Sequence, residues 1–205
     1  MDVRAIWFVL HGYGQLAGTF VRFFADVAKA GALVVAPEAL NRFYLVNPDS
    51  APARERPVGA TWMTREDRES EVADYVEYLD ALHAEITDSR RVPVTAVGFS
   101  QGAATVTRWL VNGKSRIDHL VLWGGLMPPE VDLVRGAVRI RDARVTLVAG
   151  TRDQYLSDEI LAAERARFDR AGIDCELIRF DGGHVISRSV FPRLLGASLN
   201  DASDR

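Results

Sequence analysis

The sequence contains very little cysteine. Cys175 is the only one among 205 residues, so the chain cannot form an internal disulfide bond. It lies in an apolar run that is typical of a β-strand, where a small apolar side chain suits a core. We therefore expect Cys175 to be a buried structural residue and not a catalytic thiol.

Positive charge is not concentrated anywhere in the chain. The formal net charge is −3 at pH 7 and the pI is near 5.8, and no block of lysine and arginine interrupts the sequence. This balance predicts no nucleic acid partner and no attraction to an anionic membrane surface. It favours a small substrate that is neutral or weakly charged.

Long apolar segments are absent as well. The first apolar run, Ala5–Leu10, is too short for the core of a secretory signal and far too short to cross a bilayer. We therefore expect a cytoplasmic protein without integral membrane association. No pattern in the sequence indicates an oligomeric state.

The sequence does contain enough apolar material for one substantial core, since 48% of its residues are hydrophobic. Short apolar runs, typical of buried parallel strands, alternate with segments of helical periodicity. The strand-like runs are residues 6–10, 33–36, 94–99, 120–123, 145–149 and 175–180, and the helical patterns cover residues 19–28, 64–88, 101–112 and 160–172. This alternation predicts one α/β domain over residues 1–205, with about six strands in a doubly wound, mostly parallel sheet and helices on both faces.

One long segment, residues 41–63, shows neither strand nor helix periodicity. It holds three prolines together with aromatic and aliphatic side chains, so plain disorder is not favoured. An irregular segment of this length in a compact domain usually has a function. We expect it to form a wall or partial lid of a substrate pocket.

A glycine-flanked serine interrupts the central pattern. Ser100 follows the strand-like run 94–99 and precedes a helix that begins with small residues, and Gly98 and Gly102 stand two residues to either side. This G-x-S-x-G arrangement predicts a nucleophile elbow, in which a sharp strand-to-helix turn lifts the serine hydroxyl clear of the sheet. Glycine is needed at both places because a side chain would collide with the neighbouring strand or helix.

A serine hydroxyl needs a base to take its proton. We expect His83, within a helix, and His119, just before a strand, to be surface residues, and we give His11 a structural role in the turn after the first strand. His184 remains, and it follows the last predicted strand by a Gly-Gly pair. Such a loop can place an imidazole over the elbow, so His184 is the candidate base.

The base in turn needs a carboxylate to orient it. Asp153 stands three residues after Gly150, at the end of the preceding strand, and is the favoured candidate. Asp181 is the rival, but an Asp-Gly pair more often makes a turn. The order Ser100, Asp153, His184 is the order of nucleophile, acid and base in α/β-hydrolases.

The tetrahedral intermediate of such a reaction also needs hydrogen-bond donors for its oxyanion. The loop Leu10–Gly14 follows the first strand and carries two glycines around Tyr13. We expect the backbone N–H of Tyr13 and the backbone N–H of Gln101, in the first turn of the helix after Ser100, to form the oxyanion hole.

Four motifs together resemble one known family. They are His-Gly-x-Gly at residues 11–14, Gly-Phe-Ser-Gln-Gly-Ala at 98–103, Gly-x-x-Asp at 150–153 and Gly-Gly-His at 182–184. The chain is similar to the carboxylesterase and lysophospholipase family that includes the acyl-protein thioesterases. The resemblance implies an α/β-hydrolase fold and an acyl-serine intermediate, with no metal or other cofactor. The sequence departs from the family pattern in one respect, since its first strand already bears the oxyanion loop. We therefore expect the leading antiparallel strands of the general fold to be missing.

The substrate is less well defined than the chemistry. We expect a serine esterase acting on carboxylic esters of small or medium acyl chains. The alternatives are a thioesterase or lysophospholipase for longer chains, and a binding protein that keeps the fold without turnover. Candidate acyl-site residues, each of which is equally compatible with a place in the core, are Tyr44, Leu45, Trp62, Met63, Leu126 and Met127.

Overall fold

A six-stranded sheet forms the centre of the molecule. The computed structural model describes residues 3–47, 52–131, 133 and 137–200. All six strands run parallel, in the order β2-β1-β5-β6-β7-β8. They are β1 (Ala5–Leu10), β2 (Ala32–Val35), β5 (Val94–Phe99), β6 (His119–Trp123), β7 (Arg144–Gly150) and β8 (Cys175–Phe180). The predicted parallel sheet is therefore confirmed, and the strand order reverses between β1 and β5, where such sheets bind ligands.

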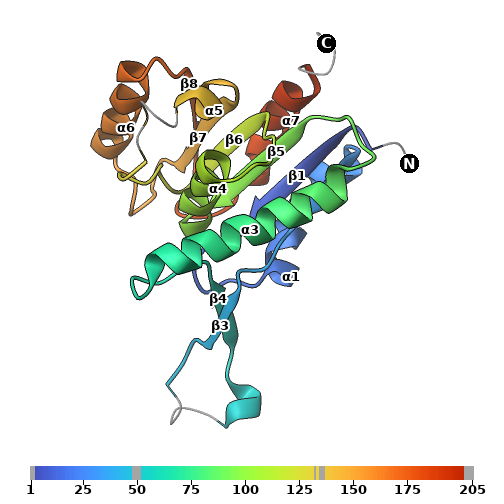
Figure 1. Ribbon diagram of the computed structural model, residues 1–205. Coiled ribbons are helices and arrows are strands. Elements are labelled where there is room, and N and C mark those ends of the chain that lie inside the picture. Colours follow the sequence, from blue (N-terminus) through green and yellow to red (C-terminus); the bar gives the residue numbers. More distant parts are fainter. Residues whose placement is uncertain (1–2, 48–51, 132, 134–136, 201–205) are drawn as a thin grey trace.

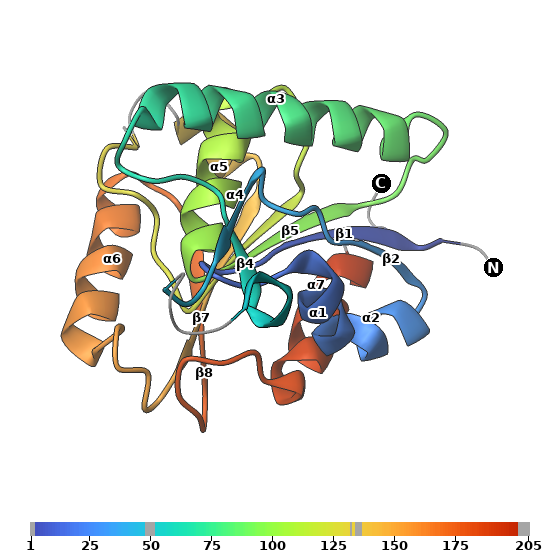
Figure 2. The same ribbon diagram turned by 90° about the horizontal axis from the view of Figure 1, so that it is seen from below.

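Helices cover both faces of this sheet (Figures 1 and 2). One face carries α3 (Arg68–Thr87), α4 (Gln101–Asn112), α5 (Ala137–Arg141) and α6 (Asp158–Arg170), and the other carries α1 (Ala17–Phe20), α2 (Ala25–Lys29) and α7 (Phe191–Asn200). Among the described residues, no helix combines the length and the apolar composition needed to cross a membrane.

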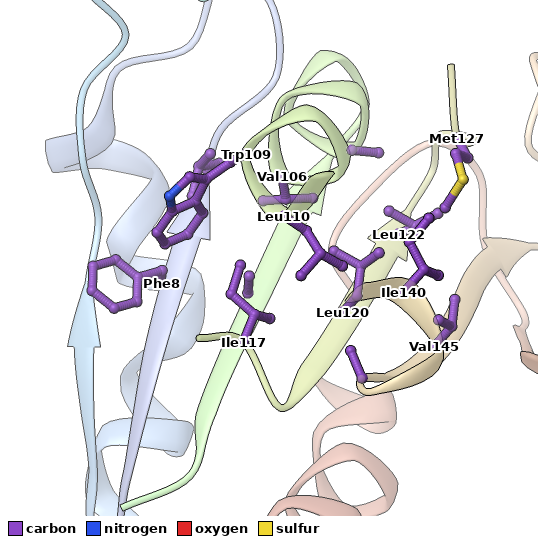
Figure 3. Packing of buried hydrophobic residues seen from close by; sticks show 14 of the residues in the cluster. Phe8, Val106, Trp109, Leu110, Ile117, Leu120, Leu122, Met127, Ile140 and Val145 are labelled. Carbon is purple, nitrogen blue, oxygen red and sulfur yellow. The ribbon is translucent and has the colours of Figure 1, made fainter. Parts of the chain in front are cut away.

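Strand β1 is apolar throughout because each of its faces meets a helix layer. In β1, Ile6, Phe8 and Leu10 pack on the side of α3 and α4, whereas Trp7 and Val9 pack on the side of α1, α2 and α7. Figure 3 shows the first of these cores, in which side chains of α4 meet those of the strands. Each fully buried side chain of this size contributes about 1.5–3 kcal/mol. An uninterrupted apolar run is therefore the expected signature of these strands.

The segment 41–63 is not irregular, contrary to expectation. Asn41–Tyr44 forms β3 and Val58–Thr61 forms β4, and the two pair as an antiparallel ribbon. A 3₁₀ turn, η3 (Ala53–Glu55), lies between them, and residues 48–51 lie outside the described part of the chain. The ribbon projects from the body of the domain (Figure 1). Its strands escaped detection because β3 is largely exposed and β4 contains small residues, so neither has an apolar alternation.

Two helix boundaries also differ from those expected. The predicted helix over 19–28 is divided into α1, a 3₁₀ turn η1 (Val21–Phe24) and α2. Helix α3 begins at Arg68 rather than after Thr64, because Thr64 is held in a preceding turn by Glu66 and Glu71. A further 3₁₀ turn, η4 (Arg188–Val190), leads into α7.

His83 and His119 are buried, so the prediction that they are surface residues is wrong. The His83 ring stacks on Phe8 with a centroid distance of 5.7 Å, and its Nε2 lies 3.0 Å from the carbonyl oxygen of Arg116. His119, the first residue of β6, is also buried, and its Nε2 lies 2.9 Å from Thr146 Oγ1. Burial lowers the pKa of both rings, and lowers that of His119 to about 4.

Because His119 is buried, the free energy of unfolding should fall in mild acid. The unfolded chain takes up a proton near pH 6.5, whereas the folded protein resists protonation down to about pH 4, so stability falls as the pH drops through this window. We expect a loss of about 2–3 kcal/mol from this residue between pH 7.5 and 4.5. Urea unfolding followed by tryptophan fluorescence measures it. His119→Gln should flatten that part of the profile, and a variant with the wild-type slope would contradict the assignment.

Candidate active site

Ser100 lies in a strained turn between β5 and α4. Its φ of 54° and ψ of −115° are unusual for a residue with a side chain. Its N–H donates to the carbonyl oxygen of Trp123 on the neighbouring strand, at 2.8 Å. A Cβ on Gly98 would lie 2.2 Å from the carbonyl oxygen of Gly102, and one on Gly102 would lie 2.3 Å from that of Leu10. The collisions expected from the G-x-S-x-G spacing are therefore present.

Asp153 and His184 meet at the same edge of the sheet. His184 Nδ1 lies 2.9 Å from Asp153 Oδ2, and the other carboxylate oxygen accepts the N–H of Tyr155 at 2.9 Å. Because Nδ1 donates its proton to the carboxylate, Nε2 keeps a lone pair and can accept a proton. The rival carboxylate, Asp181, is exposed and pairs with Arg152.

His184 and Ser100 both contact the loop that follows β6. A Cβ on Gly124 would lie 3.0 Å from His184 Cε1, and one on Gly125 would lie 2.6 Å from the carbonyl oxygen of Ser100. Consecutive residues of one loop thus contact the serine and the imidazole. Only glycine leaves room for both, and Gly124 also has a φ of 61°.

Two aromatic rings hold the imidazole. The Phe99 ring, next to Ser100 in the chain, lies 4.9 Å from the His184 ring between centroids. The Tyr155 ring lies 4.8 Å away in an edge-to-face arrangement, and it is 61% exposed. Aromatic pairs of this geometry are stabilising. The exposed tyrosine therefore stands at the mouth of the site beside the imidazole.

The loop after β1 is built around His11. Its ring is buried, Nε2 accepts the N–H of Ala39 at 3.1 Å, and Nδ1 consequently carries the proton and donates to the carbonyl oxygen of Gly12 at 2.8 Å. Burial also lowers the pKa of His11, which favours this neutral form. The structural role expected for His11 is confirmed.

This loop also presents a free donor beside Ser100. A Cβ on Gly12 would lie 3.2 Å from Ser100 Cβ, and the Gly12 N–H is already taken by Gln15 Oε1 at 2.8 Å. Within the part of the chain that the structure describes, the backbone N–H groups of Tyr13 and Gln101 have no acceptor. Both N–H groups could therefore donate to an oxyanion, and their role in an oxyanion hole stays a prediction.

The candidate acyl-site residues fall into three groups. Trp62 and Met127 are buried in the core, which is the alternative that the sequence left open for them. Tyr44 and Leu45 are exposed on the ribbon, and Leu45 Cδ2 lies 3.2 Å from where a Cβ of Gly14 would be. Met63 and Leu126 are partly buried at the edges of the core clusters.

Sequence reasoning did not single out Tyr155, Thr61 or the Gly124–Gly125 pair. Tyr155 lies in the same loop as Asp153, and the two glycines follow a predicted strand. These positions could have drawn attention to them, but their contacts depend on the tertiary fold.

Among the described residues, no group of three or more His, Cys, Asp or Glu side chains is arranged to hold a metal ion.

Comparison with known proteins identifies a family that this chain matches. The family model described as "Serine hydrolase (FSH1)" matches residues 5–190, whereas no curated protein sequence matches the chain significantly.

Several solved structures share the fold. SOBER1 from Arabidopsis thaliana is 19% identical with a TM-score of 0.70, and the match covers 97% of this chain and 99% of that one. A carboxylesterase from Mesorhizobium loti is 19% identical with a TM-score of 0.68, over 95% and 90% of the two chains. Esterase PE8 is 21% identical with a TM-score of 0.67, over 97% and 94%. These likenesses establish the α/β-hydrolase fold.

Gly12→Val tests the predicted oxyanion loop. The new side chain would press on Ser100 and displace the Tyr13 N–H, so turnover of an ester should fall by about 10²–10³, the effect of losing one oxyanion donor. Steady-state kinetics would measure this loss, and circular dichroism would check that the fold persists. Unchanged turnover would rule out this loop as part of the oxyanion hole.

Proposed function

The chain belongs to the FSH1 serine hydrolase family, and from this premise we propose that it cleaves carboxylic esters of small or medium acyl chains. In this proposal Ser100 is the nucleophile, His184 the base and Asp153 the acid that orients it. The observation that carries the assignment is the 2.9 Å hydrogen bond between His184 Nδ1 and Asp153 Oδ2, beside a strained serine.

The proposed reaction has two halves. Ser100 Oγ attacks the ester carbonyl carbon while His184 Nε2 takes the hydroxyl proton, and the carbonyl oxygen becomes an oxyanion held by the N–H groups of Tyr13 and Gln101. The C–O bond to the alcohol then breaks, and His184 returns the proton to the leaving oxygen. Water attacks the acyl-serine with the same proton relay and releases the carboxylic acid.

The surroundings of Ser100 support a small neutral substrate. Apolar side chains that are exposed or partly buried near the site, Leu45 and Leu126 among them, provide contacts for an acyl chain. The buried positions of Trp62 and Met127 remove two of the six side chains first considered for that contact. A short acyl group needs fewer such contacts than a long one.

One observation favours a second candidate function. The β3–β4 ribbon carries three exposed apolar side chains, namely Tyr44, Leu45 and Val58. A long acyl chain could lie along such a surface. A thioesterase or lysophospholipase activity on long acyl chains is therefore the alternative.

Triad substitutions test the chemistry. Ser100→Ala and His184→Ala should each lower kcat by about 10⁶, and Asp153→Asn by about 10⁴, because the three groups act as a unit. Hydrolysis of p-nitrophenyl acetate and labelling by a fluorophosphonate probe measure these losses. Asp181→Asn is the matched control, since Asp181 is an exposed carboxylate that pairs with Arg152, and it should keep wild-type activity. Full activity in Ser100→Ala would refute the proposal.

An acyl-length series tests the substrate class. The p-nitrophenyl esters of acetate, butyrate, laurate and palmitate should give the highest kcat/KM for the short chains, with Ser100→Ala defining the background. A steady rise toward palmitate would instead favour the second candidate.

A further inference from the structure

Strand β4 lies against both loops that carry the candidate oxyanion donors. On the side of the β1 loop, Gly14 N donates to the carbonyl oxygen of Ala60 at 2.9 Å, and Ala60 N donates to that of Gln15 at 3.1 Å. A Cβ on Gly59 would lie 2.4 Å from the carbonyl oxygen of Gly14, so this contact is as close as backbone atoms allow. Tyr13, the candidate oxyanion donor of this loop, lies between Gly12 and Gly14, the first residue that β4 contacts.

On the other side, the Gln101 side chain holds the end of β4. Its Nε2 donates to Thr61 Oγ1 at 2.9 Å and to the carbonyl oxygen of Met63 at 3.0 Å. Its Oε1 accepts the N–H of Trp62 at 3.1 Å. The donor and the acceptor of the carboxamide are thus both committed to residues 61–63.

A further hydrogen bond completes this arrangement. Trp62 Nε1 donates to the carbonyl oxygen of His11 at 2.9 Å, and the indole is buried. Residues 59–63 are therefore tied to the β1 loop through its backbone and to the elbow through one side chain. We call these residues the clamp segment.

An oxyanion hole requires two N–H groups that point at one oxygen from about 2.7–3.1 Å. The Tyr13 and Gln101 N–H groups follow different strands, β1 and β5, so the sheet fixes their spacing only where the strands end. Beyond that point the two loops are in contact where Gly12 meets Ser100, and the clamp segment adds hydrogen bonds to the β1 loop on one side and to Gln101 on the other. A small misplacement of one donor is enough to weaken transition-state binding.

We propose that the Gln101 carboxamide is a positioning group which, through Thr61 and the clamp segment, fixes the distance between the two oxyanion donors. This inference rests on the proposed function and adds a role for a side chain whose backbone alone enters the chemistry. Thr61 is its partner, and its hydroxyl is 2.9 Å from the carbonyl oxygen of Met63, which orients it.

The test compares Gln101→Met and Thr61→Val, which keep side-chain size but remove the hydrogen bonds. Both should lower kcat about 10- to 100-fold with KM within about twofold, because a donor is misplaced only in the transition state. Thr107→Val is the matched control, because the buried Thr107 hydroxyl donates to the carbonyl oxygen of Ala103, within α4, at 2.8 Å. It should keep wild-type kcat.

The double variant separates a shared contact from two independent ones. Thr61→Val combined with Gln101→Met should be no more than about twofold slower than Gln101→Met alone, because both remove the same connection. A double loss equal to the product of the single losses would overturn the proposal. So would unchanged kcat in Gln101→Met, or a rise in KM alone.

Hydrogen exchange provides a readout that does not require activity. Mass spectrometry of peptides covering residues 11–16 and 58–64 should show exchange about 10-fold faster in Gln101→Met and unchanged in Thr107→Val. Exchange at the wild-type rate in Gln101→Met would refute the clamp. Failure of the proposed function appears differently, as hydrolysis that survives Ser100→Ala while the exchange result stands.

Discussion

Strand β1, strand β5 and helix α4 approach one another at two glycines more closely than any side chain permits. The contacts are those of Gly98 with Gly102 and of Gly102 with Leu10, at hypothetical Cβ distances of 2.2 and 2.3 Å. They hold Ser100 in a backbone conformation that costs about 1–3 kcal/mol. Burial of β5 and α4 offsets that cost, since all six residues of β5 and eight of the twelve residues of α4 are buried. This approach of backbones brings the serine, the first N–H of α4 and the β1 loop together, and the clamp segment adds hydrogen bonds to both sides of it.

The negative charge of Asp153 is also held by its immediate neighbours. A buried carboxylate is costly unless its oxygens accept hydrogen bonds. In Asp153 one oxygen accepts the Tyr155 N–H and the other accepts the His184 imidazole, so each has a partner. We attribute to this pair the orientation of the imidazole more than the stability of the fold. The exposed Asp181 lacks that environment, which is why proximity to His184 in sequence was a poor guide.

Much of the fold was predictable because it depends on burial. The six strands were recognisable since both faces of the sheet are covered, and the elbow since its glycine spacing reflects a steric requirement. The β3–β4 ribbon was missed because it is stabilised by pairing and by contacts with the β1 loop, with no apolar pattern of its own. The burial of His83 and His119 was missed because their partners, Phe8 and Thr146, lie far away in the chain. Contacts of this kind exist only after folding.

The same limit applies within the site. Ser100, Asp153 and His184 could be named from their places after predicted strands, since the carboxyl ends of parallel strands share one edge. The side chain of Gln101 could not be interpreted, because its partners in residues 61–63 belong to a segment that had no predicted structure. From the sequence, Tyr155 could be recognised only as a residue of the loop that carries Asp153.

The position of Phe99 has a mechanical consequence. It precedes Ser100 on β5, its ring lies against the imidazole of His184, and its Cδ1 is 3.2 Å from where a Cβ of Gly12 would be. The end of β5 therefore contacts the proposed base and the predicted oxyanion loop, and it is followed directly by the proposed nucleophile. Because these contacts connect the three parts, we expect them to move together when the sheet flexes, which would preserve their alignment.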